Sequence, residues 1–112
     1  MELNIVERIA LLNVLPNEGN IITLRILKDL RSALSFTEGE LEKFKMKTTT
    51  FPDGRMSIVW DEDFNKETSE IEIGKAAHGI VVQALTSLDR RQQLKTEAIT
   101  IYEKFVEAKK VD

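Results

Sequence analysis

Apolar residues recur at helical spacing in five segments of the chain. Steps of three and four residues place side chains on one face of a helix. This spacing predicts helices over about 3–15, 22–34, 37–44, 71–91 and 97–109. The stripe in the fourth segment is the longest and continues without a miss from Ile73 to Leu88. Thr37 and Glu40 have the spacing of a capping box at the start of the third segment, and Thr96 is expected to cap the fifth.

Between the third and fourth segments the pattern changes to a period of two. Residues 45–60 alternate in the way that predicts a β-hairpin, with the Pro-Asp-Gly sequence at 52–54 in its turn. Ile58 and Trp60 share one face of the return strand. Because an isolated two-stranded hairpin is marginal in water, we expect this face to pack on the helices or on another strand.

Residues 61–70 are polar and mostly acidic, which predicts a solvated linker between the hairpin and the fourth helix. The whole chain of 112 residues has the length of one domain, 1–112. The expected fold class is therefore α+β and predominantly α, with about five helices and one β-hairpin inserted between the third and the fourth.

The composition removes much of the chemistry that enzymes use. The chain has no Cys and one His, so it cannot form a disulfide, a thiolate nucleophile or a histidine cluster. No glycine-rich phosphate loop is present, because its glycines belong to turns and predicted helices. We therefore expect no enzymatic activity and no cofactor, and His78 is interpreted as a residue at the margin of the core.

The chain has no apolar run of the roughly 18 to 20 residues needed to cross a bilayer. It opens with Met1 and Glu2 rather than with the basic and apolar regions of a signal peptide. These features predict a cytoplasmic protein without a membrane partner.

Surplus apolar surface on the first and fourth predicted helices indicates a partner. A chain this short has room in its core for about one face of each helix. The spare faces would contact a protein partner or a second copy, unless they are buried within the molecule. Aromatic residues near the hairpin are further contact candidates, since aromatics dominate interface energetics. The candidate interface residues are Leu11, Val14, Leu15, Phe51, Trp60 and Val82.

The order of three helices followed by a hairpin also fits a winged-helix-like DNA-binding regulator. Its candidate nucleic-acid patch consists of Arg25, Lys28, Lys45, Lys47 and Arg55. The net charge of −3 opposes binding of phosphate groups. The third helix, which would enter the major groove, carries Glu38, Glu40 and Glu42. DNA binding is therefore the alternative rather than the first interpretation.

A weak calcium candidate lies in the acidic segment. Asp61, Asp63, Asn65 and Glu72 have the spacing of the first, third, fifth and twelfth positions of a calcium loop. Lys66 stands where that loop needs Gly, and the preceding element is a predicted strand rather than a helix. The alternative interpretation is a solvated turn.

Three stretches of the chain resemble a family of small bacteriophage and prophage proteins with no known activity. They are LLNVLPNEGNIITLRILKDLRSALSFTEGELEKF, EIEIGKAAHGIVVQALTSLD and IYEKFVEA, which together cover most of the chain apart from the hairpin and the acidic segment. The resemblance implies the cytosol of a bacterial host and a small protein that binds other macromolecules. With the surplus apolar surface, it predicts a non-enzymatic accessory protein that acts by protein-protein association as a homo-oligomer.

Overall fold

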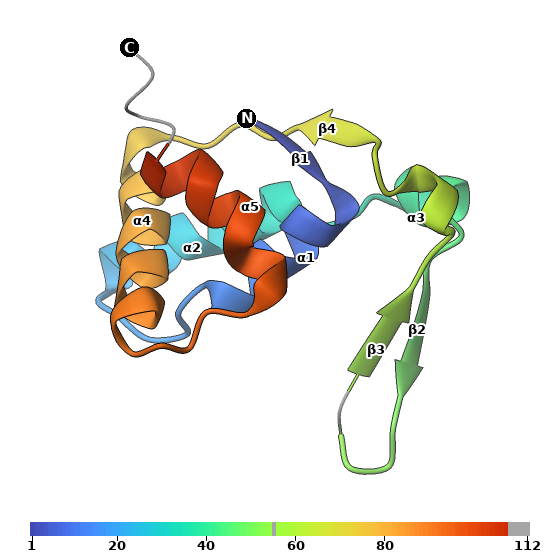
Figure 1. The fold of residues 1–112 in the computed structure, drawn as a ribbon, viewed down its shortest axis with the longest axis horizontal. Coiled ribbons are helices and arrows are strands. Elements are labelled where there is room, and N and C mark those ends of the chain that lie inside the picture. Colours follow the sequence, from blue (N-terminus) through green and yellow to red (C-terminus); the bar gives the residue numbers. More distant parts are fainter. Residues whose placement is uncertain (55, 108–112) are drawn as a thin grey trace.

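The structure, a computed structural model, describes residues 1–54 and 56–107. Its main body is a bundle of four helices, seen together in Figure 1. They are α1 (Ile5–Val14), α2 (Ile21–Leu34), α4 (Lys75–Arg90) and α5 (Ile99–Tyr102). A 3₁₀ turn, η2 (Thr96–Ala98), leads into α5, and a wider π-type turn, η3 (Glu103–Glu107), continues it. The fold is α+β and predominantly helical, as predicted.

A short two-stranded antiparallel sheet closes one end of the bundle. Strand β1 (Glu2–Asn4) pairs with β4 (Thr68–Glu70), with Leu3 opposite Ser69. Beyond the sheet, the Ile71 N–H donates to the Met1 carbonyl oxygen at 2.8 Å. Two predicted boundaries differ in the structure. The first helix begins at Ile5 because Asn4 caps it, and part of the 61–70 segment is a strand rather than a solvated linker.

The core lies where the bundle helices and β1 meet. Leu3 on β1, Leu27 on α2, Leu85 on α4 and Phe105 on η3 are all fully buried, so segments from both ends of the chain fill one core. Helix α1 contacts α2, α4, α5 and η2, and it is therefore covered on more than one side. No helix within the described residues has both the length and the apolar character needed to span a bilayer.

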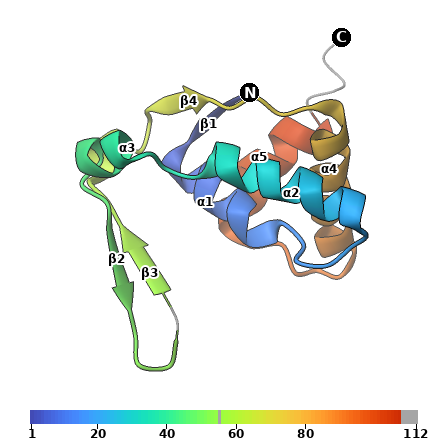
Figure 2. The same cartoon turned by 180° about the vertical axis from the view of Figure 1, so that it is seen from behind.

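The middle of the chain leaves the bundle. Helix α3 and the short 3₁₀ turn η1 form a base from which a β-hairpin projects away from the bundle, as Figures 1 and 2 show from opposite sides. We call these elements together the arm. The arm is made up of the described residues within 38–64, and it contains α3 (Glu38–Lys43), β2 (Lys47–Thr50), β3 (Met56–Val59), η1 (Glu62–Phe64) and the short segments that join them.

The hairpin itself forms as the alternating pattern predicts. Strands β2 and β3 are antiparallel, and Gly54 in the connecting turn has a φ of 90°, a conformation that favours glycine. Its expected packing is wrong, however. The strands pair only with each other among the described residues, and the Ile58 side chain is 38% exposed instead of resting on the helices.

The predicted helices near 22–34 and 37–44 agree with α2 and α3 to within a residue. The fourth begins at Lys75 rather than at residue 71, because Ile71 is buried next to β4, where its N–H donates to the Met1 carbonyl, and Gly74 has the non-helical backbone conformation of an N-cap residue. The fifth is less regular than predicted, and Thr96 is the first residue of η2 rather than its cap. The end of the predicted range, residues 108 and 109, lies outside the described residues.

Candidate interaction site

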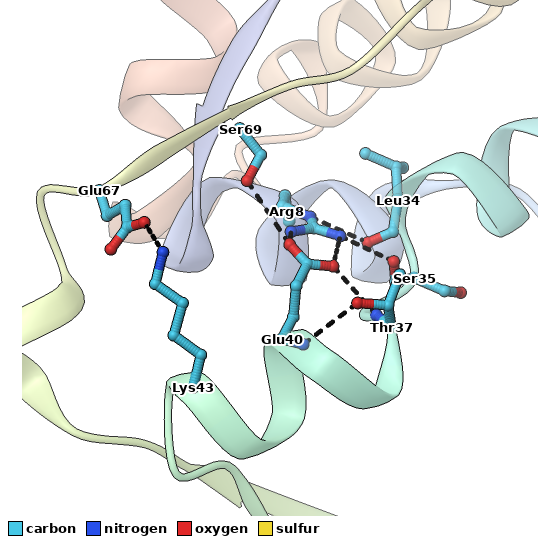
Figure 3. A network of polar contacts seen from close by, with 8 residues as sticks. All are labelled: Arg8, Leu34, Ser35, Thr37, Glu40, Lys43, Glu67 and Ser69. Carbon is cyan, nitrogen blue, oxygen red and sulfur yellow. Dashed lines mark hydrogen bonds and ion pairs between the residues drawn. The ribbon is translucent and has the colours of Figure 1, made fainter.

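The arm is attached to the bundle by the side chain of Arg8, the centre of the network in Figure 3. The buried guanidinium donates hydrogen bonds to the carbonyl oxygens of Leu34 at 3.1 Å and Ser35 at 2.7 Å. It donates to both carboxylate oxygens of Glu40, at 2.7 and 3.3 Å, and lies 4.0 Å from the ring centre of Phe36. One side chain of α1 thereby joins the end of α2 to the start of α3.

Glu40 also closes the amino end of α3. Its backbone N–H donates to the Thr37 hydroxyl at 3.1 Å, and the Thr37 N–H donates to the Glu40 carboxylate at 3.0 Å. This is the capping box that the sequence predicts. The hydrogen bonds from Arg8 lower the pKa of the Glu40 carboxyl below its ordinary value, and they outweigh the opposing effect of burial. Glu40 is therefore ionised at neutral pH, and its carboxylate binds Arg8 and so attaches the arm to the bundle.

Aromatic side chains pack at the base of the hairpin. The buried ring of Phe44 lies 5.3 Å from that of Phe64, tilted by 54°. The indole N–H of Trp60 donates to the Asn65 side-chain oxygen at 2.6 Å, and the Asp61 N–H donates to the Phe44 carbonyl at 2.9 Å. These contacts gather where the strands meet α3 and η1. Further out, the strands rely on their own pairing.

The hairpin exposes apolar side chains on both of its faces. Val59 lies opposite Lys47, and Ile58 lies opposite Thr48. Because successive side chains of a strand point to opposite faces, Ile58 and Val59 face different sides. Their side chains are 38% and 53% exposed. A partner could therefore bury apolar area on either face of the hairpin.

A groove separates one face of the hairpin from α1, and its volume is ≈ 470 Å³. Helix α1 and the arm supply its apolar sides. The side-chain amide of Asn13 and the carboxylate of Glu97 are polar groups in its lining. Among these residues, Val6 and Ile9 are half-buried. The groove is lined by Val6, Ile9, Ala10, Asn13, Ile58, Trp60 and Glu97.

Two predicted interface residues prove to be core residues. Leu11 is 0% exposed and Leu15 5% exposed, so the expectation that they meet a partner is wrong. The physical reason is that several elements cover α1, which explains why its apolar residues reach round the helix. Val14 and Val82 are half-buried and pack against the same core. The other two candidates lie in the arm, with Phe51 42% exposed and Trp60 lining the groove.

The candidate cationic patch is not one surface. Arg25 and Lys28 are exposed on α2, whose amino-terminal end lies at the side of the bundle away from the arm (Figure 2). Lys45 and Lys47 are exposed near the start of the hairpin. The Lys45 ammonium lies 4.0 Å from the Asp61 carboxylate. Arg55 lies outside the described residues.

The structure does not assemble the calcium candidate. The Asp61 carboxylate accepts from the Asp63 N–H at 3.0 Å as the cap of η1, and the Asn65 side-chain oxygen accepts from Trp60. Glu72 lies beyond β4. Within residues 1–54 and 56–107, no group of three or more His, Asp or Glu side chains is placed to hold a metal ion. His78 on α4 packs its ring 5.1 Å from that of Phe105.

Sequence reasoning missed a second buried charge. The Glu7 carboxylate is buried on α1, and it accepts from the Lys104 ammonium and from the Asn4 N–H, at 2.8 and 3.0 Å. Burial opposes its ionisation, yet the hydrogen bonds from Lys104, Asn4 and Thr100 and the charge of Lys104 together lower its pKa. The Asn-x-x-Glu spacing at 4–7 indicates the capping hydrogen bonds between Asn4 and Glu7. Nothing near Glu7 in the sequence indicates that Lys104, far along the chain, is its ion-pair partner.

Comparison with known proteins finds no family model, no curated protein and no solved structure that matches this chain.

Proposed function

We propose that this protein is a non-enzymatic, phage-type accessory protein that acts by protein-protein association in a bacterial cytosol. The observation that carries the proposal is the arm, a hairpin with exposed apolar side chains beside an apolar groove. The assignment to phages rests on the sequence resemblance alone.

The energetics favour a binding role for this surface. Covering exposed apolar area contributes about 25 cal/mol per Å² to the free energy of binding. A partner that covers one face of the hairpin gains this contribution from Ile58, and a partner that covers the other face gains it from Val59. Trp60 supplies an aromatic anchor in the groove, the kind of residue that dominates many interfaces. The exposed carboxylates of Glu62 and Asp63, on η1 at the base of the hairpin, favour basic groups on the partner.

We further propose that one partner is a second copy of the chain. Sedimentation velocity of the wild-type protein over a range of concentrations measures this association directly. We expect a species heavier than the 12.8 kDa chain to grow with concentration. A single-copy mass throughout would contradict self-association.

A matched pair of variants tests whether the groove is the surface used. Ile9→Lys places a charge in the groove, and we expect it to weaken the association. Ile22→Lys places the same charge on α2, at a side chain that is 66% exposed and lies outside the groove residues, and should leave the association unchanged. Equal effects of the two variants would contradict the use of the groove.

Duplex DNA is the second candidate partner, because Lys45 and Lys47 are both exposed at the arm. Electrophoretic mobility shift at low salt tests it, with Lys45→Glu combined with Lys47→Glu as the variant. Binding that weakens with salt and is lost in the double variant would favour DNA. The absence of a shift at low salt would remove this candidate.

A further inference from the structure

We propose that the groove between the hairpin and α1 binds an arginine side chain, presented by an extended segment of a partner protein. The aliphatic part of this arginine lies between Ile9 and Ile58. Its guanidinium group stacks on the ring of Trp60 and pairs with the carboxylate of Glu97. The inference rests on the proposed function, and it specifies the chemistry of the partner that fills the groove.

The groove contains a negative charge without a partner. Glu97 is exposed, and it is the one charged residue among those that line the groove. Within the described part of the chain, its carboxylate takes part in no ion pair and accepts no hydrogen bond. Lys95 lines a smaller adjoining hollow of ≈ 120 Å³ together with Glu97, but the two form no ion pair. A cation from a partner would complete this site, whereas an apolar partner would bury the carboxylate unpaired.

The described lysines of the hairpin lie away from the groove. In an antiparallel pair, residues directly opposite each other share one face of the sheet, and successive residues alternate between faces. Lys47 lies opposite Val59, so its side chain is on the face that does not carry Ile58. Lys45 and Lys47 line a separate hollow with Val59. The groove face carries Thr48 opposite Ile58, and a cation that enters there meets no charge from β2.

Trp60 offers the face of its ring to a ligand in the groove. Its indole N–H already donates to the Asn65 side-chain oxygen at 2.6 Å, which fixes the ring at the base of the hairpin. The half-buried ring forms part of the groove lining on the side of the arm. Guanidinium groups stack on aromatic rings, and tryptophan attracts cations more strongly than the other aromatic side chains.

The remaining lining favours arginine over lysine. Val6 and Ile9 supply an apolar wall along which the methylene groups of arginine can lie. Its planar group carries five donors, enough to bond the Glu97 carboxylate and the Asn13 amide oxygen while its face rests on Trp60. Lysine is a compact point charge without such a face. The volume of ≈ 470 Å³ also leaves room for the backbone beside the arginine, since ligand pockets range from about 300 to 1,000 Å³.

Fluorescence of Trp60 tests the site directly. Trp60 is the only tryptophan of the chain, so a ligand on its ring changes the tryptophan emission of the whole protein. The probe is a capped tripeptide with arginine between two alanines, titrated into the full chain diluted to its single-copy state. We expect a saturable change in emission. The same tripeptide with citrulline keeps the shape but lacks the charge, and its dissociation constant should be about tenfold higher.

A matched pair of variants tests the role of the carboxylate. Glu97→Gln removes the charge from the groove, and we expect it to raise the dissociation constant of the arginine tripeptide about fivefold. Glu103→Gln makes the same change at an exposed carboxylate on η3, outside the groove lining, and should leave the dissociation constant unchanged. Circular dichroism establishes that both variants keep their helices.

The outcomes separate this inference from the proposed function. Equal binding of the arginine and citrulline tripeptides, or equal effects of Glu97→Gln and Glu103→Gln, would overturn the arginine site. If the wild-type protein self-associates but the arginine tripeptide leaves the Trp60 emission unchanged, the arginine site is overturned and the association stands. If sedimentation shows a single copy while the tripeptide binds in a manner that depends on its charge and on Glu97, self-association is overturned and the arginine site stands.

Discussion

In the bundle, fourteen described residues form one buried apolar cluster, whereas in the arm Phe44 alone is buried among the residues whose burial the structure describes. The bundle draws its stability from contacts between segments far apart in the chain. The arm depends on the contacts at its base and on one pair of strands. We therefore expect substitutions in the hairpin to leave the core of the bundle folded.

The largest effect expected in this comparison comes from the core. Phe105 is fully buried, and Phe105→Ala should lower the free energy of unfolding by about 3–5 kcal/mol, since the lost burial and the cavity both contribute. Urea unfolding followed by circular dichroism measures it. Ile99→Ala, at a side chain that is 55% exposed, is the control and should stay within about 0.5 kcal/mol. Similar losses in both variants would contradict the placement of the core.

The next effect concerns the junction of the two regions. Arg8→Met removes the donors that hold Leu34, Ser35 and Glu40, and we expect a loss of about 3 kcal/mol in the free energy of unfolding. Amide hydrogen exchange should also show faster exchange in α3. Arg31→Met is the control, since Arg31 donates to the carbonyl of Pro16 at 2.7 Å away from the arm. Unchanged exchange in α3 would show that Arg8 does not attach the arm.

The sequence predicts the local features of both regions and misses what joins distant segments. The helical stripes of α2 and α4, the capping box at Thr37 and the turn at Gly54 depend on nearby residues, and the structure contains these features. Strands β1 and β4 have three residues each and pair across more than sixty positions, which leaves too short a pattern to detect.

In the candidate site too, the sequence predicts local features but not contacts between distant segments. An alternating pattern indicates that the hairpin has an apolar face, but it does not indicate whether the molecule covers that face. Leu11 illustrates the opposite error, because a helix covered by several neighbours has the same pattern as one with a spare face. Arg8 lies on the buried side of α1, three residues before Leu11, and a charged residue on that side is the signal that could have revealed its contacts with the end of α2 and with α3.

Acidification should destabilise the junction between the arm and the bundle less than Arg8→Met does. Protonation of Glu40 leaves the hydrogen bonds from Arg8 to the carbonyl oxygens of Leu34 and Ser35 in place. The folded-state pKa values of Glu7 and Glu40 lie below 4.5, so their stabilising contribution is present above that pH. It is lost as pH falls through the lowered values. Thermal unfolding against pH should therefore show a melting temperature that declines below about pH 4.5.

Glu40→Gln is the control for this pH dependence. The amide keeps a similar size but does not titrate, so the decline on acidification should be smaller in this variant than in the wild-type protein. Equal declines would show that Glu40 does not contribute. The remaining decline is then expected to include Glu7, whose carboxylate is tied to Lys104 within the bundle.

The smallest expected change in the free energy of unfolding is that of a Val→Thr substitution in the arm, which we compare with the same substitution in the bundle. Val59→Thr in the arm changes a side chain that is 53% exposed, and the free energy of unfolding of the bundle should stay within about 0.5 kcal/mol. Val81→Thr makes the same change at a fully buried position of α4 and should cost about 1–3 kcal/mol, because a hydroxyl replaces a methyl group in the core. Urea unfolding of the two variants compares them directly. If Val59→Thr costs as much as Val81→Thr, the hairpin unfolds together with the core, and the arm cannot be a separate surface kept for a partner.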